Sequence, residues 1–344
     1  MTDARLKSQS LKSWRNPLIS LAVICIIGLI FDFLDNAFFQ HMVIYVLFNM
    51  LLSMGLNLVN GYTGQFSLGH AGFMAVGAYF SAWLSTQFQI FPEALGFLNF
   101  FIYAICGGAL AALAGYMVGL PSLRLRGDYL AIVTLGFAEI IRVILLNMDQ
   151  LGGARGMYGI PGYASISLFG DVSISPFMNG FLQGAIWVLI CFFVIWRLIK
   201  SSHGRSFISV REDEIAAQAM GIDTTKTKVR AFVISSFFAG TAGSLFAHFT
   251  HYLNPSTFSF VMSVNVIIMV VLGGMGSMTG SLISAAFITI LPELLRPLQE
   301  VTGVDLRMVI FSATLIVLMI VRPQGLFGNM EFGDLWRKYV KSRS

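Results

Sequence analysis

The stretch Trp187-Val-Leu-Ile-Cys-Phe-Phe-Val-Ile-Trp-Arg-Leu-Ile199 is apolar on every face of a helix up to Arg197. Val309–Val321 repeats this character, and apolar runs recur between Pro17 and Arg322 with short polar breaks. A helix needs about 20 apolar residues to cross a hydrocarbon core, whereas a transmembrane β-barrel would show alternating segments of about ten residues. The sequence therefore predicts an all-α, polytopic helical membrane protein.

The composition agrees with this class. Hydrophobic residues make up 56% of the chain and charged residues 11%, against roughly 25% charged in soluble domains. The net charge of +5 comes from loops and termini, where orientation in the membrane explains it, so we expect no nucleic acid partner. Cys25, Cys106 and Cys191 all lie in apolar runs and are interpreted as small buried hydrophobes, with no metal or disulfide implied.

Basic residues set the predicted orientation. The stretch before Pro17 carries Arg5, Lys7, Lys12 and Arg15 without a cleavage pattern after the first apolar run, which predicts an uncleaved first span. We expect a cytoplasmic segment at 1–16, a transmembrane domain at 17–325 and a cytoplasmic tail at 326–344. Eight to ten spans are possible, and ten fit the charge distribution; the candidates begin with about 17–34, 41–59, 63–87, 100–120, 128–147, 179–199 and 229–251.

A polar, glycine-rich stretch separates two of these spans. Its small and polar residues are Asn57, Asn60, Gly61, Thr63, Gly64, Gln65, Ser67, Gly69 and His70. One interpretation is a broken helix that faces a translocation path; the alternative is a tight turn outside the membrane. For His70, a hydrogen-bonded structural role is favoured over proton transfer. A stripe of small residues that predicts close helix packing follows: Ala71, Ala75, Ala78, Ala82 and Ser85.

Two further features interrupt the apolar runs. Glu139 and Arg142 stand three residues apart, which predicts a self-neutralising ion pair, with a substrate contact as the alternative. Glu293 and Arg296 repeat the spacing. A glycine-rich break divides the block 258–295 into two crossings or re-entrant pieces, and we assign it to the gate or hinge with the first glycine-rich stretch; its glycines are Gly273, Gly274, Gly276 and Gly280.

The long cytoplasmic segment at about 200–230 contains Ser209-Val-Arg-Glu-Asp-Glu-Ile-Ala-Ala-Gln-Ala-Met-Gly221. The Ser209 and Glu212 spacing predicts a capping box, and Gly221 suits a helix C-terminus, so one helix of about three turns is expected. Such an exposed helix is what a membrane subunit needs to dock onto a soluble motor; a solvated helix without a partner is the alternative. The predicted docking residues are Glu212, Glu214, Ile215, Ala216, Ala217, Met220 and Gly221.

The chain resembles the permease family of branched-chain amino-acid ABC importers, with its LivM-type and LivH-type subunits. The resemblance covers about residues 40 to 325, and its motifs are Leu56–Phe73, Arg126–Gly136, Arg211–Gly221 and Leu272–Gly280. The Arg126-Gly-Asp-Tyr129 stretch and the length look closer to the LivM type. In ABC permeases a Glu-Ala-Ala…Gly loop docks the ATPase; here Ile215 is inserted after the Glu, which leaves the register of docking open.

The resemblance implies a complex in the bacterial inner membrane. Its other members would be a second, LivH-like permease subunit, two ATPase subunits and a periplasmic solute-binding protein. No Gly-x-x-x-x-Gly-Lys-Ser/Thr sequence is present, so ATP-Mg would bind the partner subunits, and this chain would be neither an enzyme nor a cofactor carrier. Leucine, isoleucine and valine are the expected substrates, with urea or short amides as the alternative within the family and a stand-alone channel or secondary transporter outside it.

Overall fold

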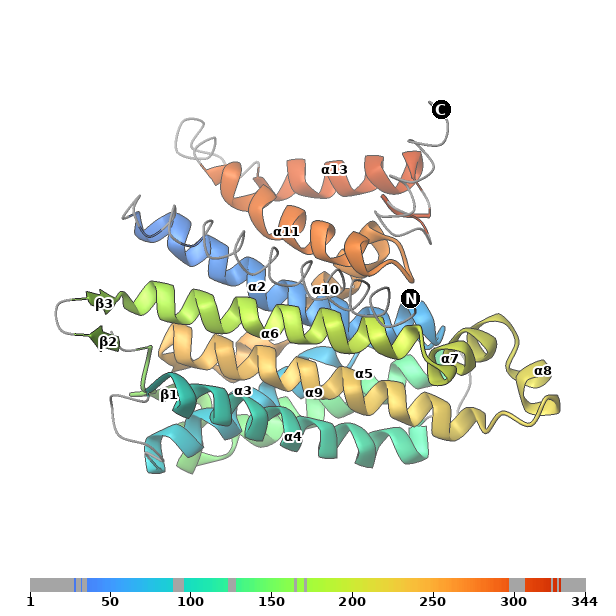
Figure 1. Ribbon diagram of the computed structural model, residues 1–344, viewed down its shortest axis with the longest axis horizontal. Helices are drawn as coiled ribbons and strands as arrows, with labels where there is room; N and C mark the ends of the chain where they lie inside the picture. The colour runs from blue at the N-terminus through green and yellow to red at the C-terminus, as the bar shows by residue number, and fades with distance from the viewer. Residues whose placement is uncertain are drawn as a thin grey trace, which may run out of the picture.

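The computed structural model describes residues 28, 32, 36–88, 96–122, 128–163, 166–169, 172–296, 307–322, 324–326 and 328. The main bundle is made of long helices that run along one axis (Figure 1). They are α2 (Ala37–Asn57), α3 (His70–Gln87), α4 (Gly96–Ser122), α5 (Asp128–Leu146), α6 (Pro176–Ile199) and α9 (Thr224–Thr250). Three further helices follow in the chain: α10 (Phe260–Gly273), α11 (Met278–Leu294) and α13 (Arg307–Val321). The predicted all-α class is confirmed.

Shorter elements close the two ends of the bundle. At one end lie α7 (Ser202–Glu212) and α8 (Glu214–Ala219), here named the docking end. At the other, the hairpin end, β1 (Met157–Tyr158) pairs antiparallel with β4 (Tyr252–Leu253), and β2 (Ile166–Phe169) pairs with β3 (Val172–Ile174). The remaining short helices are η1 (Leu58–Tyr62), η3 (Asp149–Leu151), η4 (Gly153–Arg155) and η5 (Pro255–Phe258).

Five helices in the described part of the chain are long and apolar enough to cross a membrane, judged by length and composition. They are α2 together with η1, α4, α5, α6 and α9. The shorter α10 and α11 are also apolar. This agrees with a polytopic helical membrane protein. The first predicted span, the segment 1–16 and most of the tail lie outside the described residues, so the count of ten spans stays a prediction.

The core lies where α3, α4 and α9 cross. A Cβ atom on Gly77 of α3 would stand 2.3 Å from the Cα atom of Gly240 in α9, so these backbones meet without side chains between them. A Cβ on Gly243 would likewise stand 2.1 Å from the Met74 carbonyl oxygen. Small residues permit such contacts because apolar helices in lipid associate through close packing. The stripe residues of α3, Ala71, Ala75, Ala78, Ala82 and Ser85, are all buried. A Cβ on Gly243 would also stand 2.9 Å from the Ala78 nitrogen, so the predicted close packing is present.

Polar side chains mark where several helices begin. Ser175 accepts a hydrogen bond from the Met178 N–H at the start of α6, and Asp223 accepts one from the Lys226 N–H at the start of α9. Such caps satisfy amides that have no partner inside the helix. The same N–H bond, aided by the Lys226 side chain, holds the pKa of Asp223 below its usual value.

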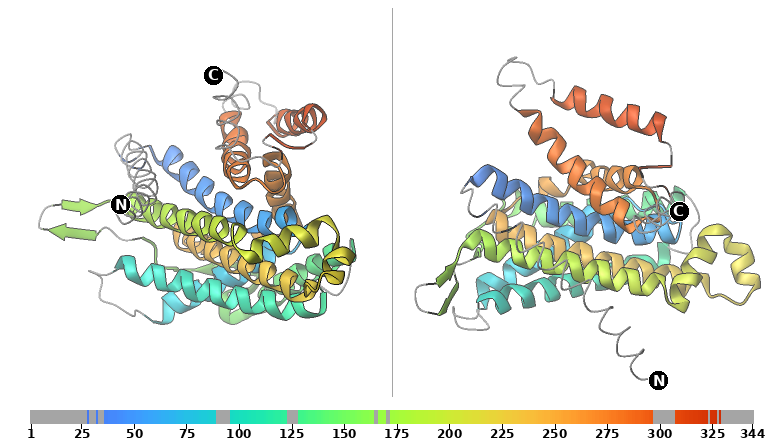
Figure 2. Two further views of the ribbon diagram at one scale, coloured as in Figure 1. Left: turned by 45° about the vertical axis from the view of Figure 1, so that its right-hand side comes forward. Right: turned by 45° about the horizontal axis from the view of Figure 1, so that its top comes forward.

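The predicted break at Gly273–Gly280 is confirmed. Helix α10 ends at Gly273, and α11 begins at Met278 and runs back toward the hairpin end. The turn between them needs positive φ angles at Gly274 (106°) and Gly276 (92°), a conformation that favours glycine. The views in Figure 2 show α11 and α13 extending away from the main bundle on the α2 side.

Candidate functional site

The predicted polar stretches meet in one place, through the side chain of Asn57. Asn57 lies at the end of α2 and is fully buried. Its Oδ1 accepts a hydrogen bond from the Gly276 N–H at 2.9 Å, and its Nδ2 donates to the Ser277 carbonyl oxygen at 2.9 Å. One amide group therefore joins two backbone groups of the break between α10 and α11: the Gly276 N–H, and the Ser277 carbonyl, which also accepts from Ser281.

The next turn of the chain is a π-helix, η1, in which Gly61 permits a close approach. A Cβ atom on Gly61 would stand 2.4 Å from the Gly276 nitrogen. No larger residue fits there unless η1 moves away from the break. Thr63 closes the turn by donating its hydroxyl to the Val59 carbonyl at 2.7 Å. A π-turn at the end of an α-helix is often found at functional sites.

The docking segment joins the same place through Arg211. Its Nη1 donates to the Gly61 carbonyl oxygen at 3.0 Å, and its Nη2 lies 2.7 Å from Oε1 of Glu212. A Cβ on Gly64, where φ is +68°, would stand 2.9 Å from the Arg211 Cγ. We name this meeting point the junction pocket: a recess of about 420 Å³ lined by Asn60, Gly61, Gly64, Gln65, Phe66, Arg211, Glu212 and Met275.

Most residues after the π-turn are buried, whereas Gly64 and Phe66 are exposed. Asn60 Oδ1 accepts from the Ser67 N–H at 3.3 Å, and Gln65 Nε2 donates to the Thr63 hydroxyl at 2.9 Å. The Leu68 N–H donates at 3.0 Å to the hydroxyl of Thr134, seven residues into α5. These contacts hold the segment between α2 and α3 against α5, and its position relative to the membrane stays a prediction.

His70 begins α3 and is buried. Its Nε2 atom is buried without a hydrogen-bond partner in the described part of the chain, so the structural role favoured from sequence stays a prediction. His248 and His251 contact backbone: their Nδ1 atoms lie 2.8 Å and 3.3 Å from the carbonyl oxygens of Pro161 and Ile160. Among the described residues, no group of three or more His, Cys, Asp or Glu side chains could hold a metal ion.

The prediction of a single docking helix is wrong. The chain forms α7 and α8, separated at Asp213, whose backbone is extended at φ −157°. Ser209 does not cap a helix; its hydroxyl donates to the Arg205 carbonyl inside α7. Asp213 is the cap instead, because its Oδ1 accepts from the N–H groups of Ile215 and Ala216 at 2.8 and 3.0 Å. A carboxylate serves this position better than the expected Ser–Glu pair because it accepts two amides at once.

Helix α8 presents an apolar face to the outside at the far tip of the docking end (Figure 1). Ile215 is 66% exposed and Met220 is 83% exposed, and Ala216 and Ala219 are exposed beside them. Ala217 lies on the opposite, buried side. Glu214 also turns inward, since its Oε2 is 2.7 Å from the buried Nζ of Lys228. Ala217 and Glu214 therefore hold α8 in place and are not part of its exposed face.

Gly221 ends α8 as predicted. Its φ of +82° is left-handed, and the following Ile222 N–H donates back to the Ala217 carbonyl at 3.0 Å while the Gly221 N–H donates to Gln218. This is a Schellman ending, which favours glycine. The two short turns around Asp213 and Gly221 therefore fix the direction of α8.

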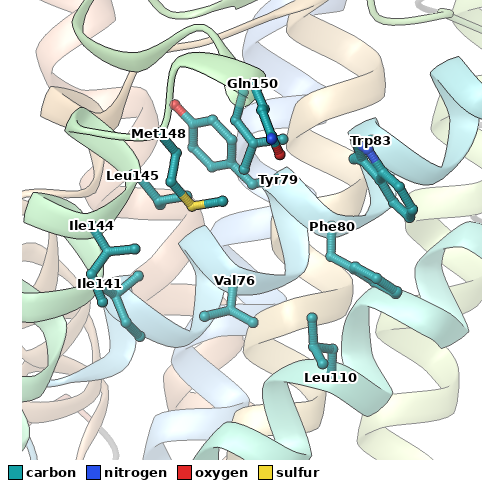
Figure 3. A pocket seen from close by; sticks show the side chains of 11 residues that line it. Val76, Tyr79, Phe80, Trp83, Leu110, Ile141, Ile144, Leu145, Met148 and Gln150 are labelled. Carbon is teal, nitrogen blue, oxygen red and sulfur yellow. The ribbon is translucent and has the colours of Figure 1, made fainter.

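A second recess lies near the hairpin end, between α3, α4 and α5 (Figure 3). It has a volume of about 430 Å³ and is mostly apolar, with Val76, Tyr79, Phe80 and Trp83 from α3, Leu110 from α4, and Ile141, Ile144, Leu145 and Met148 from α5 and the loop after it. The α5 residues that line this recess lie on the side of α5 that faces α4.

These features define a polytopic helical membrane protein with interrupted helices and an exposed apolar helix face at one end of the bundle. Residues 38–319 match the family model described as branched-chain amino acid transport system, permease component. The chain belongs to this family.

Named relatives agree with this assignment. The high-affinity branched-chain amino acid permease protein LivM of Salmonella typhimurium is 38% identical over 297 residues, covering 80% of this chain and 67% of the relative. LivH of Escherichia coli is 23% identical over 290 residues, covering 82% and 91%. In the solved structure of PsaBC from Streptococcus pneumoniae with Fab, one chain overlays with a TM-score of 0.42 at 11% identity, covering 86% of this chain and 95% of that one.

Proposed function

We propose that the chain is the LivM-type permease subunit of an ATP-driven importer that carries leucine, isoleucine and valine across the bacterial inner membrane. The observation that carries the proposal is the exposed apolar face of α8, joined to the broken spans through Arg211. The greater similarity to LivM than to LivH supports the subunit type. The names of these relatives supply the substrate class.

The proposed complex contains a LivH-like permease, two ATPase subunits that bind ATP-Mg, and a periplasmic solute-binding protein. Ile215 and Met220 would enter a groove on one ATPase. Burying such side chains contributes about 1.5–3 kcal/mol each, enough to hold a docking contact. The docking end would face the cytoplasm, as would both chain termini, because the basic residues Lys200, Arg205 and Arg230 lie at that end.

In this mechanism, closure of the ATPases moves α8. Asp213 and Glu212 lie directly between α8 and Arg211, so the motion reaches the Gly61 carbonyl and η1. The Asn57 amide then transmits it to the turn at Gly276. The junction pocket would thus couple the docking helix to the two predicted gate segments, 57–70 and 273–276.

Reconstitution in proteoliposomes tests the function. The chain, co-expressed with a LivH-like permease and the ATPase subunits of the same system, should take up radiolabelled leucine only with ATP inside the proteoliposomes and the binding protein outside them. Uptake of urea but not leucine would replace the substrate with the alternative in the same family. Uptake by the purified chain alone, without ATP, would overturn the importer and favour a channel or secondary transporter.

A further inference from the structure

Helix α5 carries an ion pair away from its ends. Oε2 of Glu139 lies 2.7 Å from Nε of Arg142, as expected from their spacing, and their side chains are 35% and 28% exposed. Glu139 is seven residues from the end of α5 at Leu146, or about 10 Å at 1.5 Å per residue. A charge exposed to lipid at this depth is strongly unfavourable. An ion pair left partly open here is therefore expected to face protein or water.

The contacts of α5 show which way the pair points. Thr134 and Ala138 face α3, because Gly69 and Gly72 approach them closely. Ile144 lines the recess between α3, α4 and α5 (Figure 3). At about 100° per residue, Ile144 lies on one side of the face formed by Thr134 and Ala138, and Glu139 and Arg142 lie on the other side. Beyond α3 and α4, α5 also contacts η5, η4 and α10.

Helix α10 also carries an exposed polar side chain. Asn265 is exposed although it lies within the apolar sequence of α10. Ser263 of α10 accepts from the Ala71 N–H, and Thr134 of α5 accepts from the Leu68 N–H, so these two residues lie at similar depth. Counting along the two helices places Asn265 about 10 Å closer to the docking end than Glu139.

The rest of this surface is apolar. Ile132 and Val143 of α5 are 64% and 48% exposed, and Val261 of α10 is 63% exposed. Gly136, between Ile132 and Glu139 on the same stripe of α5, is exposed, and a Cβ added there would meet no atom within 4 Å. Lipid alone would favour a uniformly apolar stripe. Charges of both signs among branched apolar side chains match a small zwitterion with an apolar side chain.

We propose that Glu139 and Arg142 form a binding site for the α-amino and α-carboxylate groups of the transported amino acid. The site rests on the proposed function, because the second permease subunit would close this surface into a path. The Arg142 guanidinium donates paired N–H hydrogen bonds to the substrate carboxylate. The Glu139 carboxylate accepts hydrogen bonds from the substrate ammonium group. The apolar side chain of the substrate lies against Ile132 and Val143. When no substrate is bound, the two residues neutralise each other.

Asn265 is the next polar contact along the path toward the junction pocket. Its amide can donate to the carboxylate and accept from the ammonium group, so a zwitterion leaving the ion pair finds a partner about 10 Å further on, a distance estimated from helix rise. Successive weak sites of this kind allow a bound solute to move on.

The charge-swapped variant E139R/R142E tests the site. A purely structural pair survives the exchange, because opposite charges remain three residues apart. A substrate site does not survive it, since each charge now stands where the opposite group of the amino acid must bind. In the reconstituted complex we expect leucine uptake at least tenfold lower, with unchanged subunit assembly and with ATP hydrolysis still stimulated by the loaded binding protein. Uptake equal to that of the unaltered complex would overturn the proposal.

Two further variants complete the test. E293R/R296E exchanges the other pair with the same spacing, in which Nη1 of Arg296 lies 3.8 Å from Oε2 of Glu293, and it should leave uptake unchanged. Asn265→Ala should reduce uptake severalfold without changing assembly; unchanged uptake would remove Asn265 from the path. If the unaltered complex itself imports no amino acid, the proposed function fails, whereas intact leucine import by the swapped variant refutes only the site.

Discussion

At the scale of single residues, Asn57 links two segments that lie more than 200 positions apart in the sequence. Asn57→Ala would remove the side-chain acceptor of the part-buried Gly276 N–H, whereas the Ser277 carbonyl would keep its bonds from Ser281. An unsatisfied group of this kind is unfavourable by about 1–3 kcal/mol, so we expect a lower melting temperature of the purified chain in detergent. Asn147→Ala is the control, because Asn147 is exposed and bonds only locally to Val143. Equal melting temperatures for the two variants would contradict the assigned role.

Arg211 is the residue through which the docking segment reaches the glycine-rich stretch. Arg211→Ala removes the bond to the Gly61 carbonyl but leaves α8 and its exposed face unchanged. We expect the ATPases to stay bound while leucine uptake per ATP hydrolysed falls severalfold. Arg205 is an exposed basic residue on the same helix. The Arg205→Ala variant should therefore show the same leucine uptake per ATP hydrolysed as the unaltered complex. A normal ratio in Arg211→Ala would show that coupling takes another route.

At the scale of elements, α8 is a helix whose exposed face is apolar. Met220→Glu places a charge on this face, where burial against a partner would be unfavourable, and should prevent co-purification of the ATPase subunits. Because Met220 is 83% exposed, the melting temperature of the isolated chain should remain unchanged. Tyr158→Glu makes the same kind of change at an exposed position of the hairpin end and should retain the ATPases. If the Met220→Glu variant still co-purified with the ATPase subunits, this face of α8 would be excluded as the docking site.

At the scale of the whole molecule, the separation of the docking end from the hairpin end predicts the orientation in the membrane. In a variant whose native cysteines are replaced, Tyr158→Cys should react with a membrane-impermeant thiol reagent in spheroplasts, and Ser202→Cys should react only in inverted vesicles. Both positions are exposed. Labelling of Ser202→Cys from outside would reverse the orientation that the basic residues predict.

Much of the architecture follows from local sequence. Apolar runs of helical length, the glycines at 273–280 and the small residues of α3 act over a few turns, so their patterns predict spans, a break and a close helix contact that are all present. The Glu139 and Arg142 pair is equally local, since both residues lie on one helix. The predicted docking face at Ile215 and Met220 is exposed, but its partner stays a prediction.

Other features depended on contacts between distant segments. Sequence spacing alone made Ser209 and Glu212 an acceptable cap, and only the fold shows that Asp213 breaks the helix there. Arg211 carried no pattern that separated it from its basic neighbours, because its role depends on a carbonyl 150 positions away. Composition and periodicity thus determined which segments are helical and apolar, since burial in lipid acts on each segment. The junction pocket and the flank on which Glu139 and Arg142 lie were decided by the tertiary structure, because hydrogen bonds and packing there join segments that the sequence keeps apart.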